Sequence, residues 1–323
     1  MPPRRNGWHE VDRNFRCPCC GQDHWCGYNE RGVVCMRTEN GKPTSNGGWF
    51  MSWASLQVAP PVPTAPADSE TFPQAVGLAR PERLNRVYSA WLKLLPWKHQ
   101  EHMLGRGMGR EEQDRRGYRS YSLDPLGACD LARELVARVG EPEGVPGFYP
   151  TKRGWSFYAP RGILIPVKDR EGRIVALKVR RDDPDARRRY QLVSSVRRRG
   201  GASPGLPAHW AFPKTLKRPD ILGVTEGEIK ADIAADRLGI VFVSAPGVSN
   251  WRAILPVPTA KVAIFYDQDE KAGVRRIVER HKKMLADNLK KSGVKVCLAE
   301  WNPVYKGIDD ALVAGEKIRL EPA

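Results

Sequence analysis

DILGVTEGEIKADIAADRLGIVFVSA, residues 220–245, is the stretch of sequence that decides the expected fold. Its two ends, residues 220–227 and 240–245, have the short apolar composition of buried strands, whereas residues 228–239 between them have the pattern of a helix. A strand, a helix and a second strand in this order predict two parallel strands joined by a crossover helix.

The same alternation continues toward the end of the chain. A predicted strand at residues 261–269 is followed by a helix at 273–293, a strand at 294–301 and a short helix at 309–315. The sequence therefore predicts an α/β fold with a mostly parallel sheet and flanking helices.

The segment before this alternation has mixed periodicity. Helical spacing begins at residue 84 and is interrupted by Pro96, and residues 126–139 have the pattern of a second helix. Residues 163–169 and 174–181 predict two strands joined by a tight turn. We therefore expect an α+β segment upstream of the parallel sheet.

Acidic residues stand where two of the predicted strands end. Glu226 closes the first strand, and Asp267 and Asp269 close the strand at 261–269. Adjacent carboxyl ends of parallel strands form a ligand-binding crevice, and alternation along a strand would place both aspartates on one side. Three converging carboxylates repel one another unless a hard divalent cation such as Mg²⁺ binds them. The alternative is that they are helix-capping or turn residues.

Four of the seven cysteines are crowded into CPCCGQDHWC, residues 17–26. Two close pairs of thiolates can hold a tetrahedral zinc ion, and a short segment with few aliphatic residues needs such a metal to fold. Cys19 or His24 could replace one of the ligands. The expected ligands are Cys17, Cys20, Cys26 and Cys35.

The chain is strongly basic. Its 323 residues have a formal net charge of +16, and residues 151–200 contain fifteen Lys and Arg against five Asp and Glu. Such a charge favours a polyanionic partner, with the basic segment as a phosphate track. The alternative is a surface whose charge serves only solubility.

The sequence has no run of eighteen apolar residues and no apolar segment typical of a secretory signal near its first residue. We therefore expect a cytoplasmic protein that has no membrane partner. Residues 56–74 are rich in Pro and Ala and are expected to form a semi-extended linker.

Several motifs resemble those of a known family. VTEG at 224–227 and FYDQDEKAG at 265–273 resemble the Toprim signature that bacterial-type primases, topoisomerases and some nucleases share. Residues 161–183 followed by RRYQLVSS at 188–195 are similar to the segment before Toprim in DnaG-type primases, and KGIDDALVAG at 306–315 resembles their closing motif. The order of the parts resembles in particular the primase-like proteins of phages, plasmids and other mobile elements.

The resemblance implies a division into domains and a role for each motif. The implied domains are a zinc ribbon at 1–55, a linker at 56–76, a basic subdomain at 77–218 and a Toprim domain at 219–323. The implied catalytic residues are Glu226, Asp267, Asp269 and Asp309, with Asp267 and Asp269 binding Mg²⁺ or Mn²⁺. The residues implied to bind nucleic acid and nucleotide are Arg161, Lys178, Arg180, Arg189 and Lys230.

The chain departs from the family pattern at two positions. Lys230 stands where an aspartate is frequent, four residues after Glu226, and the closing motif begins with Lys306-Gly307 instead of Lys-Asp. Both changes remove a potential ligand of a second metal ion.

The implied activity is that of a DNA primase, which joins nucleotides from nucleoside triphosphates on single-stranded DNA in a metal-dependent reaction. A replicative helicase in trans is a further partner that the resemblance allows. Two alternatives remain at this point: a Toprim nuclease, and a non-catalytic single-stranded DNA-binding replication protein with a primase fold.

Overall fold

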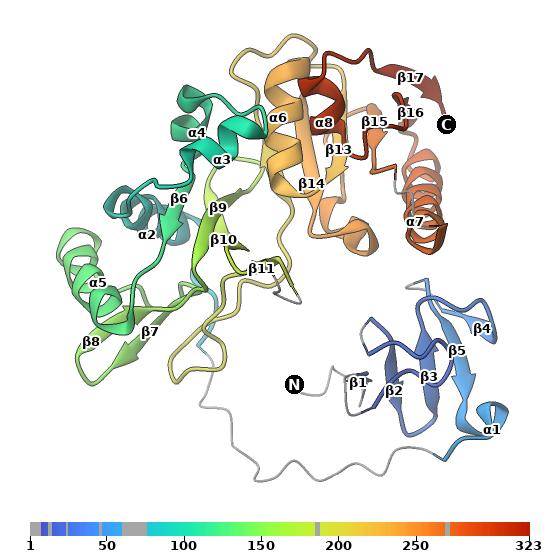
Figure 1. The fold of residues 1–323 in the computed structure, drawn as a ribbon, viewed down its shortest axis with the longest axis horizontal. Coiled ribbons are helices and arrows are strands. Elements are labelled where there is room, and N and C mark those ends of the chain that lie inside the picture. The colour runs from blue at the N-terminus through green and yellow to red at the C-terminus, as the bar shows by residue number, and fades with distance from the viewer. Residues whose placement is uncertain are drawn as a thin grey trace. The chain divides into compact units, whose positions relative to one another are not determined.

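The computed structural model describes residues 8–11, 15–23, 25–44, 47–59, 76–184, 188–268 and 272–323 (Figure 1). The chain divides into two compact units, residues 1–69 with 271–281 and residues 70–270 with 282–323. Most of the predicted linker lies outside the described residues, and the finer domain boundaries stay predictions.

The N-terminal module, residues 8–59 as far as they are described, is built on a small antiparallel sheet. Asn29 closes the tight turn before Gly32 by accepting hydrogen bonds from the backbone N–H groups of Arg31 and Gly32, at 2.9 and 3.2 Å. A Cβ atom on Gly32 would lie 2.1 Å from the carbonyl oxygen of Met51, so glycine lets the two strands approach. The sheet order is β1 (His9–Glu10), β2 (Gly27–Asn29), β3 (Gly32–Cys35), β5 (Trp49–Ser52) and β4 (Lys42–Pro43), followed in the chain by α1 (Trp53–Leu56).

The predicted α/β fold is confirmed by a six-stranded sheet. Its four central strands are parallel, and an antiparallel strand lies at each edge. The strand order is β12 (His209–Ala211), β14 (Val241–Ala245), β13 (Leu222–Glu226), β15 (Lys261–Phe265), β16 (Lys295–Glu300) and β17 (Arg319–Pro322). Its helices are α6 (Glu228–Leu238), α7 (Ala272–Lys291) and α8 (Ile308–Val313), with a 3₁₀ segment at Val248–Ile254.

The strand predicted at 261–269 is shorter than expected. It ends at Phe265, because beyond it the backbone N–H of Gln268 donates to the carbonyl of Lys306, at 2.9 Å, instead of continuing the ladder. The prediction that strand alternation places Asp267 and Asp269 on one side is therefore wrong, because the strand ends before either residue. Asp269 lies outside the described residues.

The basic sheet, β6 (Arg119–Tyr121), β9 (Gly162–Lys168), β10 (Ile174–Arg181) and β11 (Tyr190–Leu192), is antiparallel in the order β11-β10-β9-β6. The predicted hairpin corresponds to β9 and β10. The other elements here are α2 (Pro81–Leu94), α3 (Gln100–Gly105), α4 (Arg110–Arg116), α5 (Pro125–Val139), β7 (Phe148–Thr151) and β8 (Gly154–Phe157).

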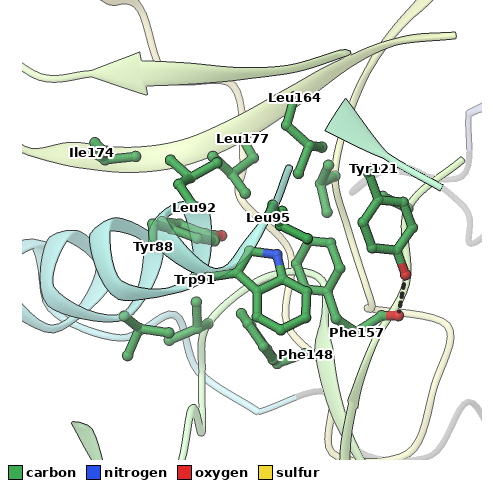
Figure 2. Packing of buried hydrophobic residues seen from close by; sticks show 14 of the residues in the cluster. Tyr88, Trp91, Leu92, Leu95, Tyr121, Phe148, Phe157, Leu164, Ile174 and Leu177 are labelled. Atoms are coloured by element: carbon green, nitrogen blue, oxygen red, sulfur yellow. Dashed lines mark hydrogen bonds between the residues drawn. The ribbon is translucent and has the colours of Figure 1, made fainter. Parts of the chain in front are cut away.

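Aromatic packing fixes the basic sheet against its helices. The Trp91 ring of α2 lies 5.1 Å from the Phe148 ring and 4.8 Å from the Phe157 ring, between centroids (Figure 2). The Tyr121 hydroxyl donates to the carbonyl of Phe157 at 2.9 Å, so its polar atom is satisfied within this core. Such a packed core holds β10 and its side chains in a fixed place.

A second apolar cluster joins the two sheets. Ile163 and Ile165 of β9 are fully buried and pack with Ile229 and Ile233 of α6. The first turn of α6 is thereby held close to the basic sheet. Among the described helices, none combines the length and the apolar composition that crossing a membrane would require.

Candidate functional site

Two predicted acids lie side by side at the end of the parallel sheet. Glu226 is the last residue of β13, and Asp267 follows the end of the adjacent strand β15. The backbone N–H of Asp267 donates to Oε1 of Glu226 at 3.4 Å. The strand pairing thus brings together two residues that are 41 positions apart.

Burial makes this pair of carboxylates costly to ionise. Burial, with the nearby Asp267 charge, raises the pKa of Glu226 to about 7. Burial also raises the pKa of Asp267, although the Lys230 ammonium opposes this change. A divalent cation would compensate both charges.

Lys230 lies in the first turn of α6. Its ammonium donates to both carboxylate oxygens of Asp267, and both side chains are mostly shielded from solvent. The residue that was predicted to contact nucleotide therefore also forms an ion pair with a predicted metal ligand.

Asp309 lies in the first turn of α8 and is 1% exposed. Arg106, just after α3, donates to its Oδ2, whereas its Oδ1 is buried without a hydrogen-bond partner in the described part of the chain. Arg106 also donates to the Tyr190 hydroxyl at 3.3 Å. The Asp309 charge raises the pKa of Asp267, so the two carboxylates are close enough to interact.

The acidic site, which we define as Glu226, Asp267 and Asp309, suits a hard cation. All three are oxygen donors, two have raised pKa values, and one has an orphaned buried oxygen. The three do not form a ready-made cluster, since among the described residues only cysteines bring three or more ligand atoms within 4.8 Å of one another.

Basic side chains of β10 lie beside α6. Lys178 forms a buried ion pair with Glu228, at 2.6 and 2.9 Å, so its charge is already partnered inside the protein. Arg180 is 8% exposed and has no carboxylate partner in the described part of the chain. Arg161 and Arg189 are exposed. A buried guanidinium without an acid fits an anionic ligand.

The charges near α3 confirm that this region is electropositive. Burial, followed by the Arg180 and Arg106 guanidinium groups, lowers the pKa of His102. Arg106 and Arg180 both lie close enough to His102 to lower its pKa, and Arg106 also pairs with Asp309. Sequence reasoning missed Arg106 and His102, because no motif surrounds them, and it missed Glu228 although it follows the VTEG motif directly.

Asp232 has a different role from the acids of the site. It is fully buried and accepts hydrogen bonds from the Arg116 guanidinium at 2.6 Å and from the Tyr118 hydroxyl at 2.7 Å. Nε2 of His209 lies 3.2 Å from Oδ1 of Asp232, the oxygen that Arg116 also contacts. Burial would raise the pKa of Asp232, but Arg116 and His209 lower it overall. This carboxylate holds α4, α6 and β12 together.

The predicted grouping of cysteines is confirmed. The Sγ atoms of Cys17, Cys20, Cys26 and Cys35 all lie within 4.8 Å of one another. Those of Cys20 and Cys26 are 3.7 Å apart, and those of Cys26 and Cys35 are 3.9 Å apart. Tetrahedral zinc with Zn–S bonds of about 2.3 Å requires S–S distances of about 3.8 Å. The four thiols therefore fit zinc.

Hydrogen bonds favour the thiolate form at Cys35, whereas the bonds shared with Cys35, together with burial, raise the pKa values of Cys17 and Cys26. Bonds from the Cys17 and Cys26 thiols, and the backbone N–H groups of Arg37 and Thr38, lower the pKa of Cys35. These N–H groups lie 3.4 and 3.3 Å from Sγ of Cys35. Cys19 is outside the cluster, and His24, the other alternative ligand, lies outside the described residues.

Comparison with known proteins gave a family match to part of the chain. Residues 252–318 match a family model described as a domain of unknown function, DUF3854. No curated protein matches the sequence.

Solved structures resemble this chain over most of its length. The zinc-binding and RNA polymerase domains of Aquifex aeolicus primase match 75% of this chain with a TM-score of 0.51 and 16% identity, and the match spans 63% of that chain. A DnaG primase catalytic domain bound to ssDNA matches 72% of this chain and 75% of its own, with 15% identity and a TM-score of 0.49. The RNA polymerase domain of Mycobacterium tuberculosis DnaG, in complex with a double-stranded DNA oligomer with an overhang, matches 74% and 80%, with 13% identity and a TM-score of 0.48. At such low identity the likeness shows the fold, and this chain has the fold of a primase zinc-binding and RNA polymerase region.

Proposed function

We propose that this protein is a DNA primase that synthesises short primers on single-stranded DNA. The observation that supports this best is the placement of Glu226 and Asp267 at the ends of adjacent parallel strands, close to Asp309 and its partner Arg106. An acidic site beside the buried guanidinium of Arg180, which has no carboxylate partner among the described residues, suits phosphate chemistry, and the shared fold agrees with it.

The chain's own residues suggest how the reaction proceeds. Glu226, at the end of β13, can accept the proton of a primer 3′-hydroxyl as the new bond to the α-phosphorus forms and the bond to pyrophosphate breaks. Arg180 and Arg106 would orient the triphosphate. Glu226, Asp267, Asp269 and Asp309 would hold Mg²⁺ or Mn²⁺, which supplies charge stabilisation at the reacting phosphorus.

Template would bind to exposed basic residues and to the N-terminal module. Arg161 and Arg189 are exposed at the ends of β9 and β11. On the N-terminal module, Trp25 is 60% exposed and has Arg37 over its ring at 5.2 Å, an arrangement on which a base can stack. Zinc in the four-cysteine site would hold this surface in shape.

The deciding experiment is incorporation of labelled nucleotides on unprimed single-stranded DNA, with Mg²⁺ and with Mn²⁺. We expect short products that require both template and metal. Metal-dependent nicking without added nucleotides would favour the nuclease alternative, and tight DNA binding without synthesis would favour the binding protein. A helicase partner and an origin in a mobile element stay predictions.

A further inference from the structure

The Lys230 ammonium is built into the acidic site. It donates to both carboxylate oxygens of Asp267. The Lys230 side chain is 20% exposed, and the Asp267 side chain is 8% exposed. An ammonium held between a helix and a buried carboxylate cannot leave without exposing an uncompensated charge. The site therefore contains a positive charge that belongs to the chain itself.

Gly307 makes room for this arrangement. A Cβ atom on Gly307 would lie 3.2 Å from Cε of Lys230 and 2.4 Å from Oδ1 of Asp309. Any side chain there would displace one of these groups. Lys230 and Gly307 each stand where the resemblance leads one to expect an aspartate. The two residues are neighbours in space.

The charges of the site limit how many further cations it needs. Glu226, Asp267 and Asp309 contribute three negative charges, and Lys230 and Arg106 neutralise two of them through direct ion pairs. Even if Asp269 adds a further negative charge, a single divalent cation compensates the negative charge that remains. A second divalent ion would be placed against an ammonium, which it repels.

We infer that Lys230 takes the place of one divalent cation, so that the nucleotide-free acidic site binds a single Mg²⁺ or Mn²⁺ ion. This rests on the proposed function in assigning the site to metal-dependent chemistry. Lys230 is a positioning residue for Asp267 and sets the metal stoichiometry of the site.

The test is to count Mn²⁺ ions bound by the full zinc-loaded chain, using electron paramagnetic resonance and calorimetry without nucleotide. A bound Mn²⁺ ion is assigned to the acidic site when the Glu226→Gln variant no longer binds it. We expect one in the wild-type protein and two in Lys230→Asp. Lys230→Met should still bind one, with at least tenfold higher affinity, because the competing ammonium is gone. Lys283→Asp, an equal charge change at an exposed position of α7, should leave the count and affinity unchanged.

A wild-type count of zero or two, or an unchanged affinity in Lys230→Met, would overturn the inference. If Lys230→Asp does not fold, the wild-type count and Lys230→Met still decide. Counting needs no nucleotide, so a protein that binds one ion yet makes no primers would support this inference and contradict the proposed function.

Discussion

Burial raises the pKa of different carboxylates of this protein alike, and their charged partners lead to opposite outcomes. Asp232 is fully buried and ionised, because Arg116 and His209 surround it. Glu226 is also largely shielded, and burial, together with the nearby Asp267 charge, raises its pKa to about 7. A satisfied buried acid stabilises a fold, whereas a pair of buried acids at a strand end is set up to bind a cation or to transfer a proton.

Asp267→Asn should abolish primer synthesis while preserving DNA binding. The substitution keeps the size of the side chain but removes the charge that holds a divalent cation, which should cost on the order of a hundredfold or more in rate. The measurements are nucleotide incorporation on unprimed DNA and fluorescence anisotropy with labelled single-stranded DNA. The control is Asp130→Asn on the exposed face of α5, where full activity is expected. A fully active Asp267→Asn enzyme would contradict the proposed mechanism.

At the scale of elements, the contact between α4 and α6 contains the Glu112 carboxyl, whose negative charge is poorly compensated by its neighbours. Burial, followed by the adjacent Asp236, raises the pKa of Glu112 to about 8, and its Oε1 has no hydrogen-bond partner among the described residues. The folded state therefore binds a proton more tightly than the unfolded state does. Its stability decreases as pH rises from about 4.5 to about 8.

Glu112→Gln should therefore stabilise the protein at alkaline pH. We expect a free energy of unfolding about 1–2 kcal/mol higher than that of the wild type at pH 9, less than the full pKa shift implies because solvent screens this partly exposed group. No gain is expected at pH 4, where the wild-type carboxyl is mostly protonated in both states. Urea unfolding at the two pH values measures it. Glu111→Gln is the matched control, since Glu111 is exposed and paired with Lys214. An equal gain at both pH values would exclude a protonation effect.

The N-terminal module depends on its cysteines, because its strands are short and its core small. Cys17→Ser should lose the zinc ion, one per chain, whereas Cys19→Ser should retain it, since Cys19 lies outside the cluster. Metal analysis of the purified variants measures this. Retained zinc in Cys17→Ser with lost zinc in Cys19→Ser would reverse the ligand assignment.

At the scale of the whole molecule, the net charge of +16 should appear in the salt dependence of DNA binding. Replacing Arg161 and Arg189 together by Ala should lower the slope of log K against log salt by about 1.4, about 0.7 for each phosphate contact with a single strand. Titrations at several salt concentrations measure the slope. Arg133→Ala on α5, an exposed arginine paired with Asp130, should leave it unchanged. An unaltered slope in the double variant would place the DNA elsewhere.

The sequence by itself determined the parts that depend on local order. Periodicity located the strands and helices of the parallel sheet, since alternation and helical spacing are properties of neighbouring residues. The close spacing of the cysteines located their cluster for the same reason. Glu226 and Asp267 were identifiable because strand ends of a parallel sheet converge whatever the detailed packing.

Only the tertiary structure decided which charges meet. Arg106 and Asp309 are 203 positions apart, and Lys178 and Glu228 are 50 apart, so no local pattern could pair them. Likewise the early end of β15 depends on a hydrogen bond from Gln268 to the distant Lys306. The ammonium of Lys230 reaches Asp267 only because β13, α6 and β15 pack side by side and Gly307 has no side chain. Such contacts arise from packing between elements, which the order of residues along the chain does not display.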